Sequence, residues 1–279
     1  MKKIYRQIDQ YLDYCARTRG MSEVTLRNKY YLDRKFAGFL LGNGCDRLEK
    51  LTNSLFDGWI GELADAGISA RTINTYNASI LAMVRYFRES GVFVPLKTPL
   101  VRKLKEAAVR RKFYTREQIA EVLRFADLET AVMIRICFDT GMRIAELTSL
   151  KLANFSGRRI IFVAKGHKLR EAYISRRTEE AMLELVREKQ VEGWLWTGEN
   201  GERLTVAGVR KRLKKPFLMA GYADFYPHSL RHSFATDLEL RGATVGEIRQ
   251  MIGHANIATT ERYLHAFDGH LAELFYKYQ

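Results

Sequence analysis

Arginine and histidine residues in the second half of the chain are spaced so that they can bind one phosphate group together. His228 and Arg231 lie three residues apart in the stretch HSLRHSFATDLEL, which is typical of a helix, so their side chains leave the same helix face. Arg143 stands in a second stretch, TGMRIAELTSL. Guanidinium groups keep their charge near neutral pH and offer paired donors to phosphate oxygens. These residues favour chemistry on a phosphodiester, whose oxygens gain negative charge when it is attacked.

Three stretches carry a resemblance to a known family. They are residues 140–150, the basic tip KGHK at 165–168 between two apolar runs, and residues 228–267. Together they resemble the boxes of the tyrosine recombinase or phage integrase family, which includes the Xer-type recombinases. The resemblance spans the second half of the chain, and the helical first part with its linker resembles the family's core-binding half.

The resemblance implies six catalytic positions in the order that the family uses. In this chain they are Arg143, Lys165, His228, Arg231, His254 and Tyr263. Tyr263 matches the nucleophile, and Glu146 stands where the family often has an acid that supports the first arginine. A phosphotyrosine would hold the energy of the broken bond, so no cofactor and no metal are implied.

The chemistry of each side chain suits a separate task. Tyrosine has a pKa of about 10, so Tyr263 needs a nearby base and positive potential to lose its proton. His228 is our candidate base, and His254 would donate a hydrogen bond to a non-bridging oxygen. Lys165, on a turn, could protonate the departing sugar oxygen as general acid. The resemblance implies that this leaving group is the 5′ hydroxyl.

Each assignment has an ordinary alternative. A tyrosine near the end of a helical protein usually packs with its hydroxyl at the surface. Arg143 could simply form an ion pair with Glu146 or Glu171. Lys168 could take the place of Lys165. The constellation as a whole, rather than any single residue, favours the catalytic interpretation.

The late histidines do not indicate a metal site, although several of them cluster. They are His228, His232, His254, His265 and His270. The sequence has no H-E-x-x-H pair, and no cysteine or carboxylate stands at ligand spacing near them. We therefore expect catalysis without metal.

Composition supports a DNA-binding protein of two domains. The chain has 279 residues, is 47% hydrophobic and carries a net charge of +14, so it can bury a real core and attract polyanions. No apolar run approaches the length of a membrane-spanning helix, and we expect a cytoplasmic protein. Three cysteines without a C-x-x-C pair indicate neither disulfides nor a zinc ribbon.

Residues 1–91 are expected to form a helical, SAM-like core-binding domain of four helices. Gly20, the Gly42-Asn43-Gly44 turn and Gly67 are the predicted stops, and Ser22, Thr52 and Ser69 are the predicted caps. The fourth helix, from Arg71 to Ser90, should bury one stripe formed by Ile73, Tyr76, Ile80, Met83, Val84 and Phe87.

Residues 92–112 are expected to form a basic interdomain linker. Pro95 and Pro99 interrupt helix formation, and seven basic residues accompany a single acid, Glu106. The candidate DNA-binding residues are Lys97, Arg102, Lys103, Lys105, Arg110, Arg111 and Lys112. A solvated helix face is the alternative. Residues 1–112 hold 21 basic and 11 acidic side chains, a net of +10, against +4 for the remainder.

Residues 113–279 are expected to form a mostly helical catalytic domain with a small antiparallel sheet. Thr115 and Gln118 have capping-box spacing, and a helix of about Glu129–Asp139 should follow. Apolar runs at Arg159–Ala164 and Leu169–Ser175 predict a hairpin. The protein as a whole is thus predicted to be mainly α, and the segment from Asp268 is a plausible tail helix packing on a neighbouring copy.

The expected function is site-specific cleavage and rejoining of double-stranded DNA, for integration, excision or dimer resolution. Each active site would cut one strand, so recombination of two duplexes implies a homotetramer on paired sites. The sequence names no accessory protein. Two alternatives remain: a type IB topoisomerase that relaxes supercoils, and a non-catalytic architectural DNA-binding protein.

Overall fold

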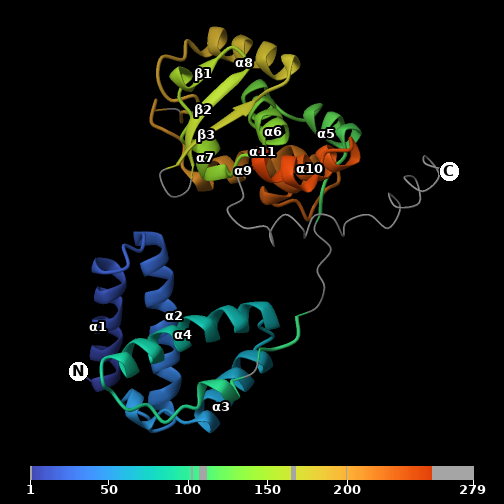
Figure 1. Ribbon diagram of the computed structural model, residues 1–279. Coiled ribbons are helices and arrows are strands. Elements are labelled where there is room, and N and C mark those ends of the chain that lie inside the picture. The colour runs from blue at the N-terminus through green and yellow to red at the C-terminus, as the bar shows by residue number, and fades with distance from the viewer. Residues whose placement is uncertain (1, 102, 107–111, 165–167, 199, 253–279) are drawn as a thin grey trace, which may run out of the picture. The chain divides into compact units, whose positions relative to one another are not determined.

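The structure is a computed structural model that describes residues 2–101, 103–106, 112–164, 168–198 and 200–252 (Figure 1). The chain divides into two compact units, Met1–Val109 and Arg110–Gln279. Each unit buries its own hydrophobic cluster, so each is described by itself.

The described residues of the first unit form four α-helices, as predicted. They are α1 (Lys3–Arg17), α2 (Glu23–Gly42), α3 (Asn53–Asp65) and α4 (Ala70–Glu89), with short 3-10 turns at Leu48–Lys50 and Thr98–Leu100. The three predicted caps are confirmed, because the hydroxyls of Ser22, Thr52 and Ser69 each accept from a backbone N–H three residues on, at 3.3–3.4 Å. Local cap chemistry therefore sets where α2, α3 and α4 begin.

The core of the first unit contains polar residues that the apolar pattern did not predict. The stripe of α4 is confirmed at Ile73, Ile80, Met83, Val84 and Phe87, but Tyr76 is half-buried and Asn77 is buried in its place. Asp33 on α2 is fully buried, with Lys29 Nζ 3.4 Å from its carboxylate. Lys29 also donates to Ser79 Oγ on α4 at 2.7 Å, so a polar cluster joins α2 to α4.

The chain after α4 continues along the first unit. Val94 and Leu96 are buried in its core. The Asn53 side chain accepts from the backbone N–H of Lys97 at 2.7 Å, and the Asn74 side chain exchanges hydrogen bonds with the backbone of Leu104. The segment through Leu104 is therefore part of the first unit's packing.

The described residues of the second unit combine helices with one small sheet. Its helices are α5 (Arg116–Leu123), α6 (Leu128–Thr140), α7 (Ile144–Thr148), α8 (Arg176–Lys189), α9 (Val206–Met219), α10 (His228–Leu240) and α11 (Val245–Ile252). The strands β1 (Phe155–Ser156), β2 (Arg159–Ala164) and β3 (Lys168–Tyr173) form an antiparallel sheet in the order β1-β2-β3. The predicted hairpin is confirmed as β2 and β3, and the two-residue β1 adds an edge.

Helix α6 is the central element of the second unit. It packs against α8 and α10 and also contacts β3 (Figure 1), and nine of its thirteen residues are buried. The predicted capping box of Thr115 and Gln118 is present at the start of α5. Within the described residues, no helix is both long and apolar enough to cross a membrane.

Candidate functional site

The turn after α6 sets the position of Arg143. Helix α6 ends at Thr140, and its C-cap residue Gly141 has a left-handed φ of +60°, a conformation that glycine adopts without strain. A Cβ there would lie 2.4 Å from Cδ1 of Phe234 on α10, so the turn packs directly on that helix. Arg143 follows as the extended N-cap residue of α7. The segment that carries Arg143 is thus held against α10 by a contact that requires glycine.

Glu146 fixes the orientation of Arg143 from the first turn of α7. Its two carboxylate oxygens accept from the Arg143 guanidinium and from the Arg143 backbone N–H, both at 2.8 Å. The Glu146 side chain is 5% exposed and that of Arg143 is 35% exposed. Of the two acids considered as partners, Arg143 pairs with Glu146, whereas Glu171 pairs with Arg159. The buried acid holds a guanidinium that still reaches solvent.

Helix α10 brings Arg231 to the same turn. Arg231 is 1% exposed, and its Nη1 donates to the carbonyl of Gly141 at 2.6 Å, while its Nη2 donates to the carbonyl of Ile252 at 2.9 Å. His228, the first residue of α10, is exposed. The structure therefore brings both arginines to the Thr140–Gly141 turn and places His228 one helical turn before Arg231.

A third arginine, which the sequence pattern did not single out, lies beside them. Arg170 on β3 has a side chain only 9% exposed, and its Nη1 is 3.7 Å from a Glu146 carboxylate oxygen. Its Nη2 donates to the carbonyl of Thr140 at 3.1 Å and to that of Met251. Burial lowers the pKa of Arg170, an effect that Glu146 opposes.

The alternation of β3 is the signal that could have revealed Arg170. Strand side chains alternate between two faces, and Ala172 and Ile174 are buried while Leu169 and Tyr173 are exposed. Arg170 shares the inward phase of Ala172. A basic residue in the inward phase of a half-buried strand is therefore a candidate for a specific role.

Lys165, His254 and Tyr263 lie outside the described residues. In sequence, Lys165 directly follows the last residue of β2. His254 comes two residues after Ile252, whose carbonyl binds Arg231. The geometry of these three predicted catalytic residues therefore stays a prediction.

The residues of the expected basic linker have different surroundings. Lys97, Lys103 and Lys105 are exposed on the first unit, and Lys112 pairs with Asp224 of the second. Arg102, Arg110 and Arg111 lie outside the described residues. The single acid, Glu106, accepts from Arg71 at 3.2 Å and from Asn74 at 3.0 Å on α4. Glu106 therefore has a structural partner on the first unit.

Helix α9 carries a second basic cluster that was not among the predicted DNA-binding residues. Its sequence VAGVRKRLKKPFLM holds five basic residues and no acid. Arg212 pairs with the buried Glu129. The other four, Arg210, Lys211, Lys214 and Lys215, are exposed. The run of basic residues in the sequence could have indicated this cluster, although it lies far along the chain from the predicted linker.

Two other potential nucleophiles of the second unit are held neutral. Burial raises the pKa of Cys137 to about 12, with a further contribution from the Glu146 carboxylate. Burial likewise raises the pKa of Tyr114 to about 12. Neither group ionises readily near neutral pH, so neither competes as a nucleophile.

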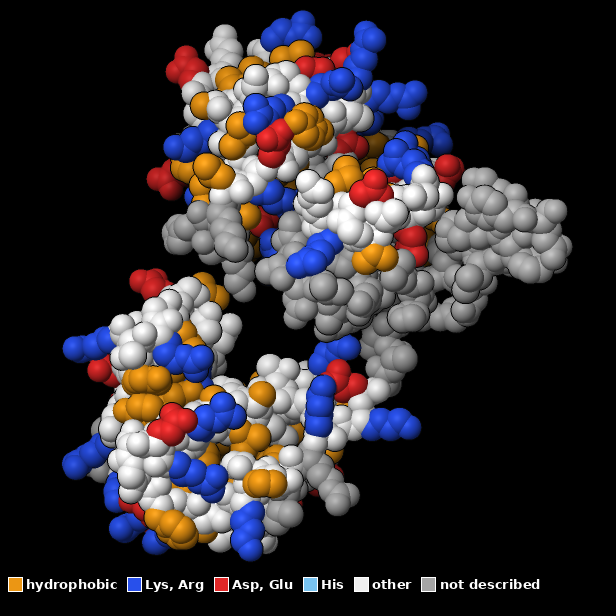
Figure 2. Space-filling model, viewed as in Figure 1, with side chains coloured by type: hydrophobic (Ala, Val, Ile, Leu, Met, Phe, Trp, Pro, Cys, Tyr) orange, Lys and Arg blue, Asp and Glu red, His pale blue; other side chains and the backbone are white. Residues whose placement is uncertain are grey.

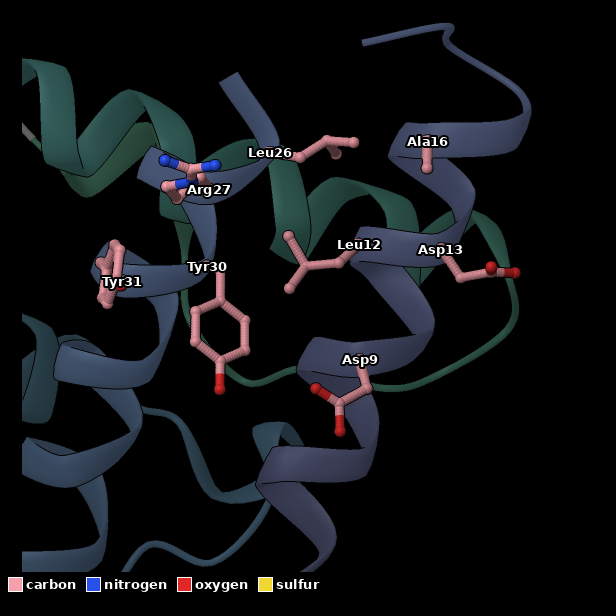
Figure 3. Close-up of a pocket in the computed structure, with 8 residues that line it drawn as sticks. All are labelled: Asp9, Leu12, Asp13, Ala16, Leu26, Arg27, Tyr30 and Tyr31. Carbon is pink, nitrogen blue, oxygen red and sulfur yellow. The ribbon is translucent and has the colours of Figure 1, made fainter. Parts of the chain in front are cut away.

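A surface pocket of about 530 Å³ lies between α1 and α2, away from these arginines in the chain (Figure 3). Figure 3 shows Tyr30 and Arg27 projecting from α2, and Asp9 and Asp13 from α1. Its lining residues are Asp9, Leu12, Asp13, Ala16, Leu26, Arg27, Tyr30 and Tyr31. None of the predicted catalytic residues lines this pocket, so it is not the candidate active site.

Comparisons with known proteins match both parts of the chain to one family. Residues 112–270 match the "Phage integrase family", and residues 8–91 match "Phage integrase, N-terminal SAM-like domain". Tyrosine recombinase XerD of Listeria monocytogenes serotype 4b is 28% identical over 292 residues, covering 96% of both chains. Tyrosine recombinase XerC of Chromohalobacter salexigens is 27% identical over 254 residues, covering 86% of this chain and 84% of that protein.

A solved structure has the same fold. The Tn1549 transposon integrase in complex with transposon right end DNA superposes with a TM-score of 0.80 at 19% identity, covering 98% of each chain. The mainly helical fold with a small antiparallel sheet is thus shared with a protein of known structure.

Proposed function

This chain belongs to the phage integrase family and is a tyrosine-type site-specific recombinase, and from that premise we propose that Arg143 and Arg231 clamp the phosphate that Tyr263 attacks. The observation that carries the proposal is the Thr140–Gly141 turn. Arg231 binds the carbonyl of Gly141, and Arg143 follows two residues later under the control of Glu146. Two guanidiniums are thus fixed around one turn, which suits an electrostatic site that needs no reorganisation during reaction.

In the proposed step, one phosphodiester bond of DNA is exchanged for a phosphotyrosine ester bond, and no water is consumed. Tyr263 Oη attacks the scissile phosphorus, its proton passes to His228, and a 3′-phosphotyrosine bond forms. The 5′ oxygen leaves with its electron pair and takes a proton from Lys165. Attack by a 5′ hydroxyl reverses the step and releases Tyr263. His254 stabilises a non-bridging oxygen.

Exposed basic surfaces support binding to double-stranded DNA. Figure 2 shows lysine and arginine side chains spread over the visible face of each unit, with fewer acidic ones between them. Lys97, Lys103 and Lys105 on the first unit and the exposed bases of α9 on the second are candidates for phosphate contacts. We assign Arg102, Arg110, Arg111 and Lys112 to the same role from the sequence.

The active assembly is proposed to be a homotetramer on two DNA sites in the cytoplasm. Each protomer supplies one tyrosine and cuts one strand, so exchange between two duplexes needs four of them. The tail from Asp268, with Leu271, Leu274 and Phe275 at helical spacing, would pack on a neighbouring copy. Closed symmetry makes such a contact repeat around the assembly.

Covalent capture on a library of DNA sequences tests the proposal. The protein is mixed with duplexes that have a randomised core, denatured, and recovered with any DNA that stays attached. We expect enriched sequences bound through a peptide that contains Tyr263, as mass spectrometry would show. Absence of any denaturation-resistant adduct under conditions of tight DNA binding would favour a non-catalytic DNA-binding protein.

The recovered sequence then separates recombination from relaxation. A plasmid with two copies of the site should yield products with exchanged flanks, and a plasmid with none should keep its supercoils. A type IB topoisomerase would relax both plasmids and exchange neither.

A further inference from the structure

Arg170 occupies an unusual place for a charged side chain. It lies on the inward side of β3 and is paired in register with Phe162 of β2. Its guanidinium lies over the Phe162 ring, 5.5 Å from the centroid. Its side chain is 9% exposed. Burying a charge is costly unless partners compensate, so the partners of Arg170 indicate why an arginine stands here.

Those partners come from three separate segments of the candidate site. Arg170 donates to the carbonyl of Thr140 at the end of α6 and to the carbonyl of Met251 on α11. It also lies 3.7 Å from Glu146, the acid that orients Arg143. A single guanidinium thus joins the sheet to α6, α7 and α11.

Arg170 and Arg231 each join the turn after α6 to α11, and the carbonyls that they bind are adjacent in sequence. Arg170 links the carbonyls of residues 140 and 251, and Arg231 links those of residues 141 and 252. The carbonyls of Thr140 and Gly141 lie at the C-terminus of α6, where carbonyls lack intrahelical partners and attract cations. Two consecutive carbonyls of the turn are therefore joined to two consecutive carbonyls of α11 by a pair of arginines.

We propose that Arg170 is a positioning residue for the recombinase reaction. It holds α11 on the turn that carries Arg143, and it shares Glu146 so that the Arg143 guanidinium keeps one orientation. The role rests on the proposed function, because it acts through Arg143 and Arg231. Arg170 itself needs no contact with DNA.

The consequence is a defect in chemistry rather than in DNA binding. Loss of Arg170 leaves the exposed basic surfaces intact, so affinity should stay within about threefold. A small misplacement of catalytic groups can slow a reaction by about a hundredfold, and we expect that loss for Arg170→Met. Arg170→Lys keeps the charge without the two-carbonyl geometry, so it should recover part of the rate, to about tenfold below wild type.

The test is single-turnover cleavage of a captured duplex by the full chain, at saturating protein. Arg159→Met is the matched control, because Arg159 lies on β2, is 47% exposed and pairs with Glu171, which is itself exposed. Such surface pairs contribute little to stability. The control should cleave at the wild-type rate.

A double-mutant cycle separates positioning from simple loss of stability. If Arg170 acts through Glu146, then Arg170→Met should slow an enzyme that already carries Glu146→Gln by less than the full amount. Additive effects of the two substitutions would overturn the proposal. Equal rates for Arg170→Met and Arg159→Met would also overturn it, as would a parallel loss of DNA affinity and cleavage. If the wild-type chain formed no adduct at all, the proposed function itself would fail instead.

Discussion

Glu146 binds Arg143 at both ends of the residue, accepting from its backbone N–H and from its guanidinium at 2.8 Å each. The first contact caps α7 and the second aims the side chain. One buried acid thus couples the start of a helix to the orientation of a proposed phosphate-binding group.

Replacement of Glu146 should separate these two tasks. Glu146→Gln keeps an oxygen acceptor but loses the charge, so we expect cleavage to slow by about tenfold with little change in DNA affinity. Glu146→Ala also loses the helix cap and leaves the Arg143 guanidinium without its carboxylate partner. This variant should lower the free energy of unfolding by about 1–3 kcal/mol. Single-turnover cleavage and chemical denaturation measure the two effects. Equal behaviour of both variants in both assays would contradict this division.

Tyr263→Phe should bind DNA and form no covalent complex, because the ring remains while the attacking oxygen is gone. Denaturing gels with nicked site DNA report the adduct, and filter binding reports the affinity. Persistent adduct would place the nucleophile elsewhere. Tyr226, which is 39% exposed and two residues before His228, would then be tested first, followed by Tyr276.

Binding of DNA by residues 1–112 alone should weaken steeply as salt rises. Phosphate neutralisation releases counterions, and the slope of log affinity against log salt grows with the number of phosphates neutralised. Substituting exposed Lys97 and Lys105 by alanine should reduce the slope by roughly one for each lysine that binds a phosphate. The matched control is Lys50→Ala, since Lys50 pairs with Asp46 in the first unit. A flat salt response of the unsubstituted segment would contradict the basic-surface assignment.

Asp33 should make the first unit less stable as pH rises. Burial raises its pKa to about 6, although Lys29 lies close by and lowers it in part. The unfolded chain has the ordinary pKa of about 4, so the folded state holds the extra proton between these values. The favourable contribution is therefore complete below about pH 4 and is lost as pH rises through about 6.

The comparison with Asp33→Asn isolates this effect. Wild type should lose roughly 2–3 kcal/mol relative to the variant between about pH 4 and pH 7.5. Hydrogen exchange of peptides from α2 measures stability in the first unit specifically. Asp57→Asn, an exposed position on α3, is the control and should show no such trend. A constant difference between wild type and Asp33→Asn would rule out this titration.

Local signals explain which parts of the fold could be predicted. Ser22 and the Thr115–Gln118 box act through hydrogen bonds within four residues, so the sequence alone predicts those helix starts. Asn77 is buried where an apolar pattern predicts Tyr76, because tertiary packing rather than hydropathy selects that face. Strand β1 has two residues, too few to show any alternation.

In the candidate site, too, local features could be predicted from the sequence and tertiary contacts could not. The resemblance to the tyrosine recombinase family predicted Arg143, Glu146 and Arg231 as site residues, and the pairing of Arg143 with Glu146 follows from their spacing of three. Arg231 is buried and donates to the carbonyl of Ile252, which is 21 positions away. Arg170 donates to carbonyls that are 30 and 81 positions away. The alternation of β3 could mark Arg170 as a candidate, but no local pattern encodes which distant carbonyls these arginines contact, so only the folded chain reveals those partners.

Arg231 therefore has two tasks, and they bear on how its loss should appear. It is proposed to stabilise charge on the non-bridging oxygens, and it also bridges Gly141 to Ile252. Neither task depends on which atom leaves the phosphorus. Lys165, in contrast, is proposed to act only on the leaving oxygen.

Lys165→Ala should be rescued by a better leaving group, whereas Arg231→Ala should not. An alkoxide needs a general acid to depart, but a 5′-bridging phosphorothiolate leaves as a stable thiolate and needs none. Single-turnover cleavage of oxygen and sulfur substrates by both variants makes the comparison, with DNA affinity measured as the control for folding. Arg231→Ala should remain slower by orders of magnitude on either substrate, since the charge on the non-bridging oxygens persists. If sulfur fails to restore Lys165→Ala, Lys165 is not the acid, and Lys168 and His228 must be tested in that role. If sulfur restores both variants equally, the two roles are not separate.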